Sequence, residues 1–138
     1  MESKKEQAVF NFKHGHNCAQ AVICAYSEDF HVDKETAYRL AEGFGSGIPG
    51  QSTICGAASG MVMCAGLKNC EKMDVEHTTK KITYPCVESM LAAFQERIGN
   101  LECKHLLQQD DELIDGKRAK CISYVSCACD IIEEMLYK

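Results

Sequence analysis

The sequence predicts an all-α, single-domain helical bundle of about five to six helices, with a glycine-rich loop before the helix that carries Cys55. Three observations favour this fold. Apolar residues recur at helical spacing in successive segments, residues that commonly cap helices precede several of them, and no segment shows the apolar–polar alternation of a half-buried strand. The 138 residues fit one domain, expected to span residues 1–138 without a linker or repeat.

Three helices are expected in the first third of the chain. A short one covers about Lys4 to Phe12. Asn17 can cap the second and Asp33 the third, because their side-chain oxygens accept hydrogen bonds from the free N–H groups of a first helical turn. The apolar positions expected to face the core are Ala21, Val22, Ala25 and Tyr26 in the second helix, and Ala37, Leu40 and Ala41 in the third.

A glycine-rich loop follows over residues 43–50, which hold four glycines and a proline and cannot form a regular helix. Ser52 or Thr53 can then cap a helix that opens near Cys55. The first residues of that helix, 56–60, have unusually small side chains, which allow a neighbouring element or a ligand to approach the backbone closely.

The second half of the chain is also predicted to be helical. Residues 75–98 form one long helix or two, since Pro85 either kinks the helix or starts a second piece, and Gly99 is a suitable stop. A helical turn fits residues 103–107. An acidic loop over residues 110–116 then precedes a last helix over about residues 117–137, whose basic start at residues 117–120 is interpreted as a solvated face.

Composition and charge exclude several functions. The formal net charge of −5 argues against nucleic-acid binding, which needs clustered Lys and Arg. The start of the chain lacks the apolar stretch of a signal peptide. The longest apolar run, near residues 61–67, is too short for membrane insertion. A cytoplasmic protein is therefore expected, and in that compartment thiols are normally kept reduced.

Ten cysteines are the outstanding feature of the composition: Cys18, Cys24, Cys55, Cys64, Cys70, Cys86, Cys103, Cys121, Cys127 and Cys129. In a cytoplasmic chain such a number indicates metal or redox chemistry more than structural disulfides, although about half are expected to be small core residues. The sequence contains no C-x-x-C, which excludes the common zinc-ribbon, ferredoxin and thioredoxin patterns, and no C-x-x-C-H, which excludes covalent haem attachment.

The spacing that recurs is C-x5-C, as in Cys18/Cys24 and Cys121/Cys127. On a helix this step leaves two side chains roughly 120° apart in rotation and about 9 Å apart along the axis. Such pairs cannot share a metal. Any cysteine centre must therefore be assembled from several helices.

Cys55 has a distinctive position where the glycine-rich loop meets a helix start. A helix N-terminus favours the thiolate through its free N–H groups and dipole, so Cys55 is expected to be the most acidic or most strongly ligating thiol. Gly45 and Gly47 form a lone G-x-G without a preceding strand or a following Lys-Ser, so nucleotide binding is not expected. His14 and His16, which precede Cys18, are expected in an exposed loop.

Several segments together resemble the redox-active protein family C_GCAxxG_C_C. They are Gly15-His16-Asn17-Cys18-Ala19-Gln20-Ala21-Val22, Gly43-Phe44-Gly45-Ser46-Gly47-Ile48, Cys55-Gly56-Ala57-Ala58-Ser59-Gly60, Cys103-Lys104-His105-Leu106-Leu107 and Lys120-Cys121. The resemblance covers about residues 10–136. It implies a helical domain with four characteristic cysteines, which fall here on Cys18, Cys55, Cys103 and Cys121.

The same resemblance extends to the iron–sulfur region of split-Soret cytochromes, which implies that the four cysteines could hold an iron–sulfur cluster or another thiolate-bound metal. Cys55 and Cys18 are then the expected catalytic residues, and Gly45, Gly47, Gly56 and Gly60 the expected cofactor-binding glycines. The chain departs from the family pattern in its six further cysteines and in His16, where the family often has an aromatic residue.

Three functions remain open from the sequence: electron transfer through an iron–sulfur or other thiolate-held metal centre, metal-free dithiol–disulfide exchange, and a non-catalytic helical module that stores or senses metal or binds a partner. A redox partner protein and a homodimer are both compatible with the sequence.

Overall fold

The computed structural model describes residues 2–107, 111–114 and 116–137. It confirms the predominantly helical prediction. The α-helices within the described residues are α1 (Lys5–Lys13), α2 (Cys18–Tyr26), α3 (Lys34–Ala41), α4 (Gly56–Asn69), α5 (Lys80–Ile98), α6 (Cys103–Leu107) and α7 (Ala119–Leu136). Two 3₁₀ segments, η1 (Ser27–Phe30) and η2 (Glu42–Gly47), connect the early helices.

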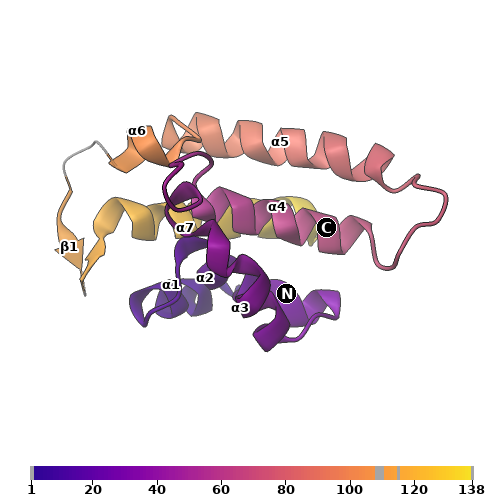
Figure 1. The fold of residues 1–138 in the computed structure, drawn as a ribbon, viewed down its shortest axis with the longest axis horizontal. Helices are drawn as coiled ribbons and strands as arrows, with labels where there is room; N and C mark the ends of the chain where they lie inside the picture. The colour runs from indigo at the N-terminus through magenta and orange to yellow at the C-terminus, as the bar shows by residue number, and fades with distance from the viewer. Residues whose placement is uncertain (1, 108–110, 115, 138) are drawn as a thin grey trace.

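The helices form three layers (Figure 1). α5 lies on one side, α4 and α7 lie in the middle, and α1, α2 and α3 lie on the other side. α2 is the most enclosed helix, since every residue from Ala19 to Tyr26 is buried. α5 is the least enclosed, because it buries only Met90 and Phe94. The core therefore sits where α2, α4 and α7 meet.

The predicted caps at Asn17 and Asp33 are confirmed. The Asn17 side chain accepts a 2.8 Å hydrogen bond from the backbone N–H of Gln20, and the Gln20 side chain accepts a 3.0 Å bond from the backbone N–H of Asn17. The Asp33 carboxylate accepts a 2.9 Å bond from the N–H of Thr36. Both caps provide acceptors for backbone N–H groups that have no partner within the helix at its start.

The cap predicted for the α4 helix was wrong. The N-cap residue is Cys55 itself. Thr53 is instead tied to the glycine-rich loop: its backbone N–H and its hydroxyl both donate to the carbonyl of Gly47, at 2.7 and 2.9 Å. Ser52 has a φ of +51° and is not placed to cap.

α5 is one helix and not two, with Pro85 in its interior. It begins at Lys80, five residues later than the earliest predicted start, and ends at Gly99, whose φ of +102° confirms the predicted stop. Pro85 lacks an N–H, so the carbonyl four residues earlier loses its helical partner.

A small hairpin, which the sequence did not predict, precedes α7. Strands β1 (Leu113–Ile114) and β2 (Lys117–Arg118) are antiparallel, with Leu113 opposite Arg118. α7 consequently begins at Ala119, two residues later than predicted, and the basic pair Lys117 and Arg118 is not on a solvated helix face. Asp110 and Asp115 of the predicted acidic loop lie outside the described residues.

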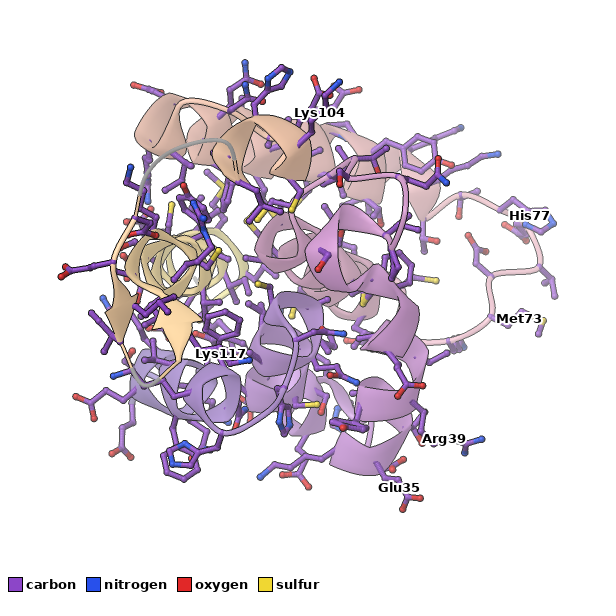
Figure 2. All side chains as sticks on the ribbon, turned by 60° about the vertical axis from the view of Figure 1, so that its left-hand side comes forward. Glu35, Arg39, Met73, His77, Lys104 and Lys117 are labelled. Carbon is purple, nitrogen blue, oxygen red and sulfur yellow. The ribbon has the colours of Figure 1, made fainter. Side chains whose placement is uncertain are left out.

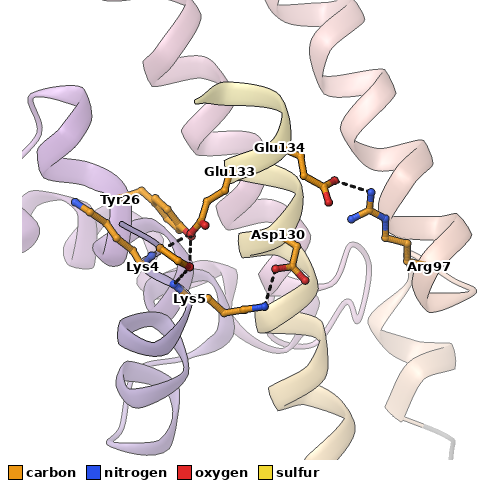
Figure 3. A network of polar contacts seen from close by, with 8 residues as sticks. Lys4, Lys5, Tyr26, Arg97, Asp130, Glu133 and Glu134 are labelled. Atoms are coloured by element: carbon orange, nitrogen blue, oxygen red, sulfur yellow. Dashed lines mark hydrogen bonds and ion pairs between the residues drawn. The ribbon is translucent and has the colours of Figure 1, made fainter. Parts of the chain in front are cut away.

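Polar contacts fasten the outer helices to α7 (Figure 3). The Glu133 carboxylate accepts hydrogen bonds from the Tyr26 hydroxyl at 2.5 Å and from the Lys4 backbone N–H at 3.0 Å. Lys5 pairs with Asp130 at 2.8 Å, so α1 is held along α7. Among the described helices, none combines the length and the apolar character needed to cross a membrane.

Candidate thiolate centre

One cavity of about 290 Å³ brings together the four cysteines singled out from the sequence, Cys18, Cys55, Cys103 and Cys121. They come from four separate segments: the first residue of α2, the N-cap of α4, the first residue of α6 and the first turn of α7. Apolar side chains complete much of the wall, among them Phe12, Leu106 and Tyr124. Such a site leaves no trace in local cysteine spacing.

Backbone hydrogen bonds hold the segments of Cys55 and Cys103 side by side. The N–H of Cys55 donates to the carbonyl of Leu101 at 2.7 Å, and the N–H of Cys103 donates to the carbonyl of Thr53 at 2.6 Å. Ile54 and Glu102 form an isolated antiparallel bridge between these two bonds. The loop before α4 and the loop before α6 therefore act as one short two-stranded connection that fixes both cysteines.

Two glycines allow the cysteine segments to approach each other. A Cβ on Gly47, whose φ is +69°, would lie 2.6 Å from the Cβ of Cys103. A Cβ on Gly56 would lie 3.1 Å from the Cβ of Cys18. Real Cβ atoms essentially never approach within 3.0 Å, so the fold requires glycine at position 47, whereas at position 56 glycine avoids an unusually tight contact.

The four glycines predicted to bind a cofactor differ in their surroundings. Gly56 lines the cavity, whereas the space beside Gly45, Gly47 and Gly60 is filled by protein. A Cβ on Gly45 would lie 2.9 Å from the Asn17 side chain, and one on Gly60 would lie 2.9 Å from the carbonyl oxygen of Ala19. These three glycines pack helices and loops together.

Cys121 is the most acidic of the four thiols. Its pKa falls to about 7, first because Cys18 donates a hydrogen bond to its sulfur, and then because the positive charge of Arg118 lies close by. The same hydrogen bond, together with burial, raises the pKa of Cys18 well above its ordinary value. The pair thus consists of a thiol that keeps its proton and a neighbour that readily loses one.

Cys55 was expected to be the most acidic or the most strongly ligating thiol, and the first alternative does not hold. Backbone N–H groups of Ala57 and Ala58 do donate to its sulfur, as its position at a helix start predicts. Burial outweighs them, because a thiolate loses water solvation in the core, and the pKa of Cys55 rises to about 11. Burial also raises the pKa of Cys103, against the opposing charge of Arg118.

Sequence reasoning missed Arg118 and Asp111. Arg118 lines the cavity and lies within hydrogen-bonding reach of the Cys121 sulfur. Asp111 lies 3.9 Å from the Arg118 Nε and is itself nearly buried, with a side chain 4% exposed. The signal available was the three-residue step from Arg118 to Cys121, which places both on one side of a helix start.

The hairpin forms part of the cavity wall. Lys117 lines the cavity and stands 5.2 Å from the ring centre of Phe12. Figure 2 shows Lys117 on the opposite side of the molecule from the loop that carries Met73 and His77. His14 stacks on Phe10 at 3.9 Å and His16 contacts Tyr38, so neither histidine joins the wall of the cavity.

The other six cysteines, all of them described, do not line this cavity. In the pairs Cys18/Cys24 and Cys121/Cys127 the first member faces the cavity, while the second is buried elsewhere, as the 120° rotation of a six-residue step requires. Cys24 donates to the carbonyl of Lys34 at 3.7 Å.

The donor set does not match a single metal ion. Among the described residues, no three His, Cys, Asp or Glu side chains converge on the position of a single ion. A single zinc ion needs its sulfur ligands about 2.3 Å away on all sides. An iron–sulfur cluster differs, because several irons share the four cysteines, with one cysteine on each iron of a [4Fe–4S] cluster and two on each iron of a [2Fe–2S] cluster. Four thiols around one cavity are the ligand type and number that such a cluster takes.

The fold and the cavity define a small helical protein with four cysteines around one partly buried cavity. The chain matches the family described as "Putative redox-active protein (C_GCAxxG_C_C)" over residues 16–135, and it belongs to that family. It is 26% identical over 137 residues to an uncharacterized protein of Archaeoglobus fulgidus, a match that covers 94% of this chain and 91% of the relative. No solved structure matches the chain.

Proposed function

We propose that this redox-active family member transfers electrons through an iron–sulfur cluster, or another thiolate-bound metal group, held by Cys18, Cys55, Cys103 and Cys121. The observation that supports the proposal is the convergence of these four cysteines, from four segments, on one cavity of about 290 Å³. Thiolates are the preferred ligands of such clusters.

When bound, the cluster would take up and release one electron. The chain's own contribution is to hold and shield the thiolates. N–H groups at the start of α4 donate to the Cys55 sulfur, and Arg118 faces the Cys121 sulfur, so two of the four thiolates have partners. Cys55 and Cys103 are buried, and the apolar wall limits contact with water.

The Cys18–Cys121 pair favours a second candidate, metal-free dithiol–disulfide exchange. The Cys121 thiolate would attack one sulfur of a substrate disulfide, form a mixed disulfide and release the other sulfur as a thiolate. Cys18 would then pass its proton to that thiolate and attack Cys121, which forms the Cys18–Cys121 disulfide and releases the second substrate sulfur. Two electrons pass from the dithiol to the substrate. The hydrogen bond between the two cysteines and the pKa of Cys121 near 7 support this alternative.

The deciding experiment is anaerobic purification with measurement of iron, acid-labile sulfide and the visible spectrum. Under the cluster proposal the protein is coloured, and serine at any of the four cavity cysteines lowers the iron content severalfold. Matched controls lie on the same helices: Cys24→Ser for Cys18 on α2, and Cys127→Ser for Cys121 on α7.

Two outcomes contradict the cluster. One is a colourless, iron-free protein that forms a Cys18–Cys121 disulfide on mild oxidation, which is the result expected for dithiol exchange. The other is an equal loss of iron in the cavity variants and in the two controls, which indicates a general effect on folding.

A further inference from the structure

Arg118 is a cation that lies against the cysteine cavity and is held there by contacts with other segments. It is the last residue of β2 and the N-cap residue of α7, and it lines the cavity beside Cys121. Its guanidinium donates from Nη2 to the carbonyl of Leu106 at 3.4 Å. Its side chain thus spans from the hairpin to α6 across the site.

Asp111 holds the Arg118 side chain in this position. Its carboxylate oxygen Oδ2 lies 3.9 Å from the Arg118 Nε and accepts a 2.6 Å hydrogen bond from the backbone N–H of Lys120. The carboxylate therefore holds both the guanidinium and the first turn of α7, the turn that carries Cys121. With a side chain only 4% exposed, it has little freedom to move.

The ionised side chains that line the cavity carry one sign of charge, while the Asp111 carboxylate, outside the lining, acts on the Cys121 sulfur in the opposite direction to Arg118. Among the described residues that line the cavity, the ionised side chains other than the cysteines are Lys117 and Arg118, both cations, although the chain as a whole has a net charge of −5. The charge of Arg118 acts on the sulfurs of both Cys103 and Cys121. A cluster bound by four thiolates is an anion, and a lone thiolate is one as well.

We propose that Arg118, oriented by Asp111, is a positioning residue that compensates the negative charge of the sulfur centre and thereby raises its reduction potential. The proposal rests on the proposed function in placing that centre at the four cysteines. One-electron reduction of a cluster adds one negative charge without breaking a bond. A fixed cation close by stabilises the reduced state relative to the oxidised state, since net charge and hydrogen bonds to sulfur set cluster potentials.

The direction of the effect is the same if the centre is a dithiol. Reduction of a Cys18–Cys121 disulfide takes two electrons and one proton, breaks the sulfur–sulfur bond, and leaves the proton on Cys18 and a thiolate on Cys121 beside Arg118. Loss of the cation destabilises this reduced form also. The potential therefore tests Arg118, whereas the iron content and the number of electrons test the cluster.

The experiment is protein-film voltammetry on anaerobically purified full-length chain, with Arg118→Gln compared with wild type. The expected result is a shift of about tenfold toward the oxidised form, the scale of one hydrogen bond to a charged group. It corresponds to a fall of about 59 mV for a one-electron centre or about 30 mV for a two-electron centre.

Two further variants separate the local effect from general ones. Arg118→Lys keeps the charge and should restore most of the wild-type potential. Arg97→Gln removes an arginine that pairs with Glu134 at 2.7 Å on the surface between α5 and α7, and it should leave the potential unchanged. Circular dichroism confirms that each variant keeps its helices.

A folded Arg118→Gln protein with the wild-type potential overturns the inference, as does an equal fall in Arg97→Gln. An iron-free, two-electron centre whose potential falls only in Arg118→Gln overturns the cluster and retains the role of Arg118.

Discussion

Gly47 and Cys103 lie in such close contact that a Cβ added to the glycine would stand 2.6 Å from the Cβ of the cysteine. The same Cβ would lie 2.9 Å from the backbone nitrogen of Thr53, whose carbonyl accepts the N–H of Cys103. The glycine-rich loop therefore serves the cysteine centre through packing: it lets α6 approach α4 closely enough for Cys103 to reach Cys55.

This contact predicts that Gly47→Ala destabilises the protein by about 2–4 kcal/mol, because it combines a strained positive φ with a steric clash against backbone that cannot move away. Urea unfolding followed by circular dichroism measures the loss. Gly66→Ala is the matched control. A Cβ there meets nothing within 4 Å, and alanine in the last turn of α4 should stabilise by about 0.5–1 kcal/mol. Equal stability of the two variants would contradict the packing role of Gly47.

The Cys18–Cys121 hydrogen bond predicts a pH dependence. In protein freed of metal with a chelator under anaerobic conditions, Cys121 should react with iodoacetamide with a midpoint at about pH 7, and Cys55 only toward pH 11. Cys18→Ala removes the donor that stabilises the Cys121 thiolate, so the pKa of Cys121 rises and its reactivity curve moves to higher pH. Mass spectrometry of labelled peptides gives both curves. An unchanged midpoint in the variant would show that Cys18 does not stabilise the thiolate.

A surface contact of α1 predicts a modest acid sensitivity. Lys4 donates to the Asp29 carboxylate at 2.7 Å and the Tyr137 hydroxyl donates to it at 2.8 Å, and the pair with Lys4 is the main reason that the pKa of Asp29 is lowered. Since the folded pKa is below the unfolded one, the stabilisation is complete above about pH 4 and disappears as the pH falls through the folded pKa.

Because Lys4 and Asp29 are partly exposed, Asp29→Asn should cost only about 0.5 kcal/mol at pH 6. The free energies of unfolding of the variant and of wild type, measured in urea at a series of pH values, should converge once the pH has fallen through the folded pKa of Asp29. A difference that persists at the same size in acid would mean that the carboxylate charge is not its source.

Local sequence signals predicted most of the helices because these signals act over one or two turns. The side chains of Asn17 and Asp33 can cap a helix by themselves, and Gly99 can adopt the positive φ that ends one. Ser52 and Thr53 have the same capping side chains, but Thr53 instead bonds to Gly47, a tertiary contact that local propensity does not contain.

In the site, too, local signals could be predicted from the sequence and tertiary contacts could not. The four cavity cysteines were identified by resemblance to a family, not by spacing, because their positions are set by contacts between α2, α4, α6 and α7. The acidity of Cys55 was mispredicted since its helix-start position is a local signal, whereas the burial that raises its pKa is a property of the folded core. Arg118 was assigned to a solvated helix face because its place in the hairpin before α7 comes from pairing with Leu113, a contact that local sequence does not reveal.

The buried hydroxyl of Tyr26 provides a last prediction. Tyr26 is fully buried in α2, and its hydroxyl donates a 2.5 Å hydrogen bond to the Glu133 carboxylate of α7. Burial raises the pKa of Tyr26, so the phenol stays protonated and remains a donor throughout the stable pH range. Tyr26→Phe keeps the ring and its packing but leaves the carboxylate short of one partner. Hydrogen bonds to charged groups contribute about 1.5–3 kcal/mol, so the variant should unfold in urea with a stability lower by about 2 kcal/mol. Tyr84→Phe is the control, since the Tyr84 side chain on α5 is 63% exposed and should lose almost nothing. If Tyr26→Phe is as stable as wild type, the carboxylate has found other partners and the Tyr26–Glu133 bond does not hold α2 to α7.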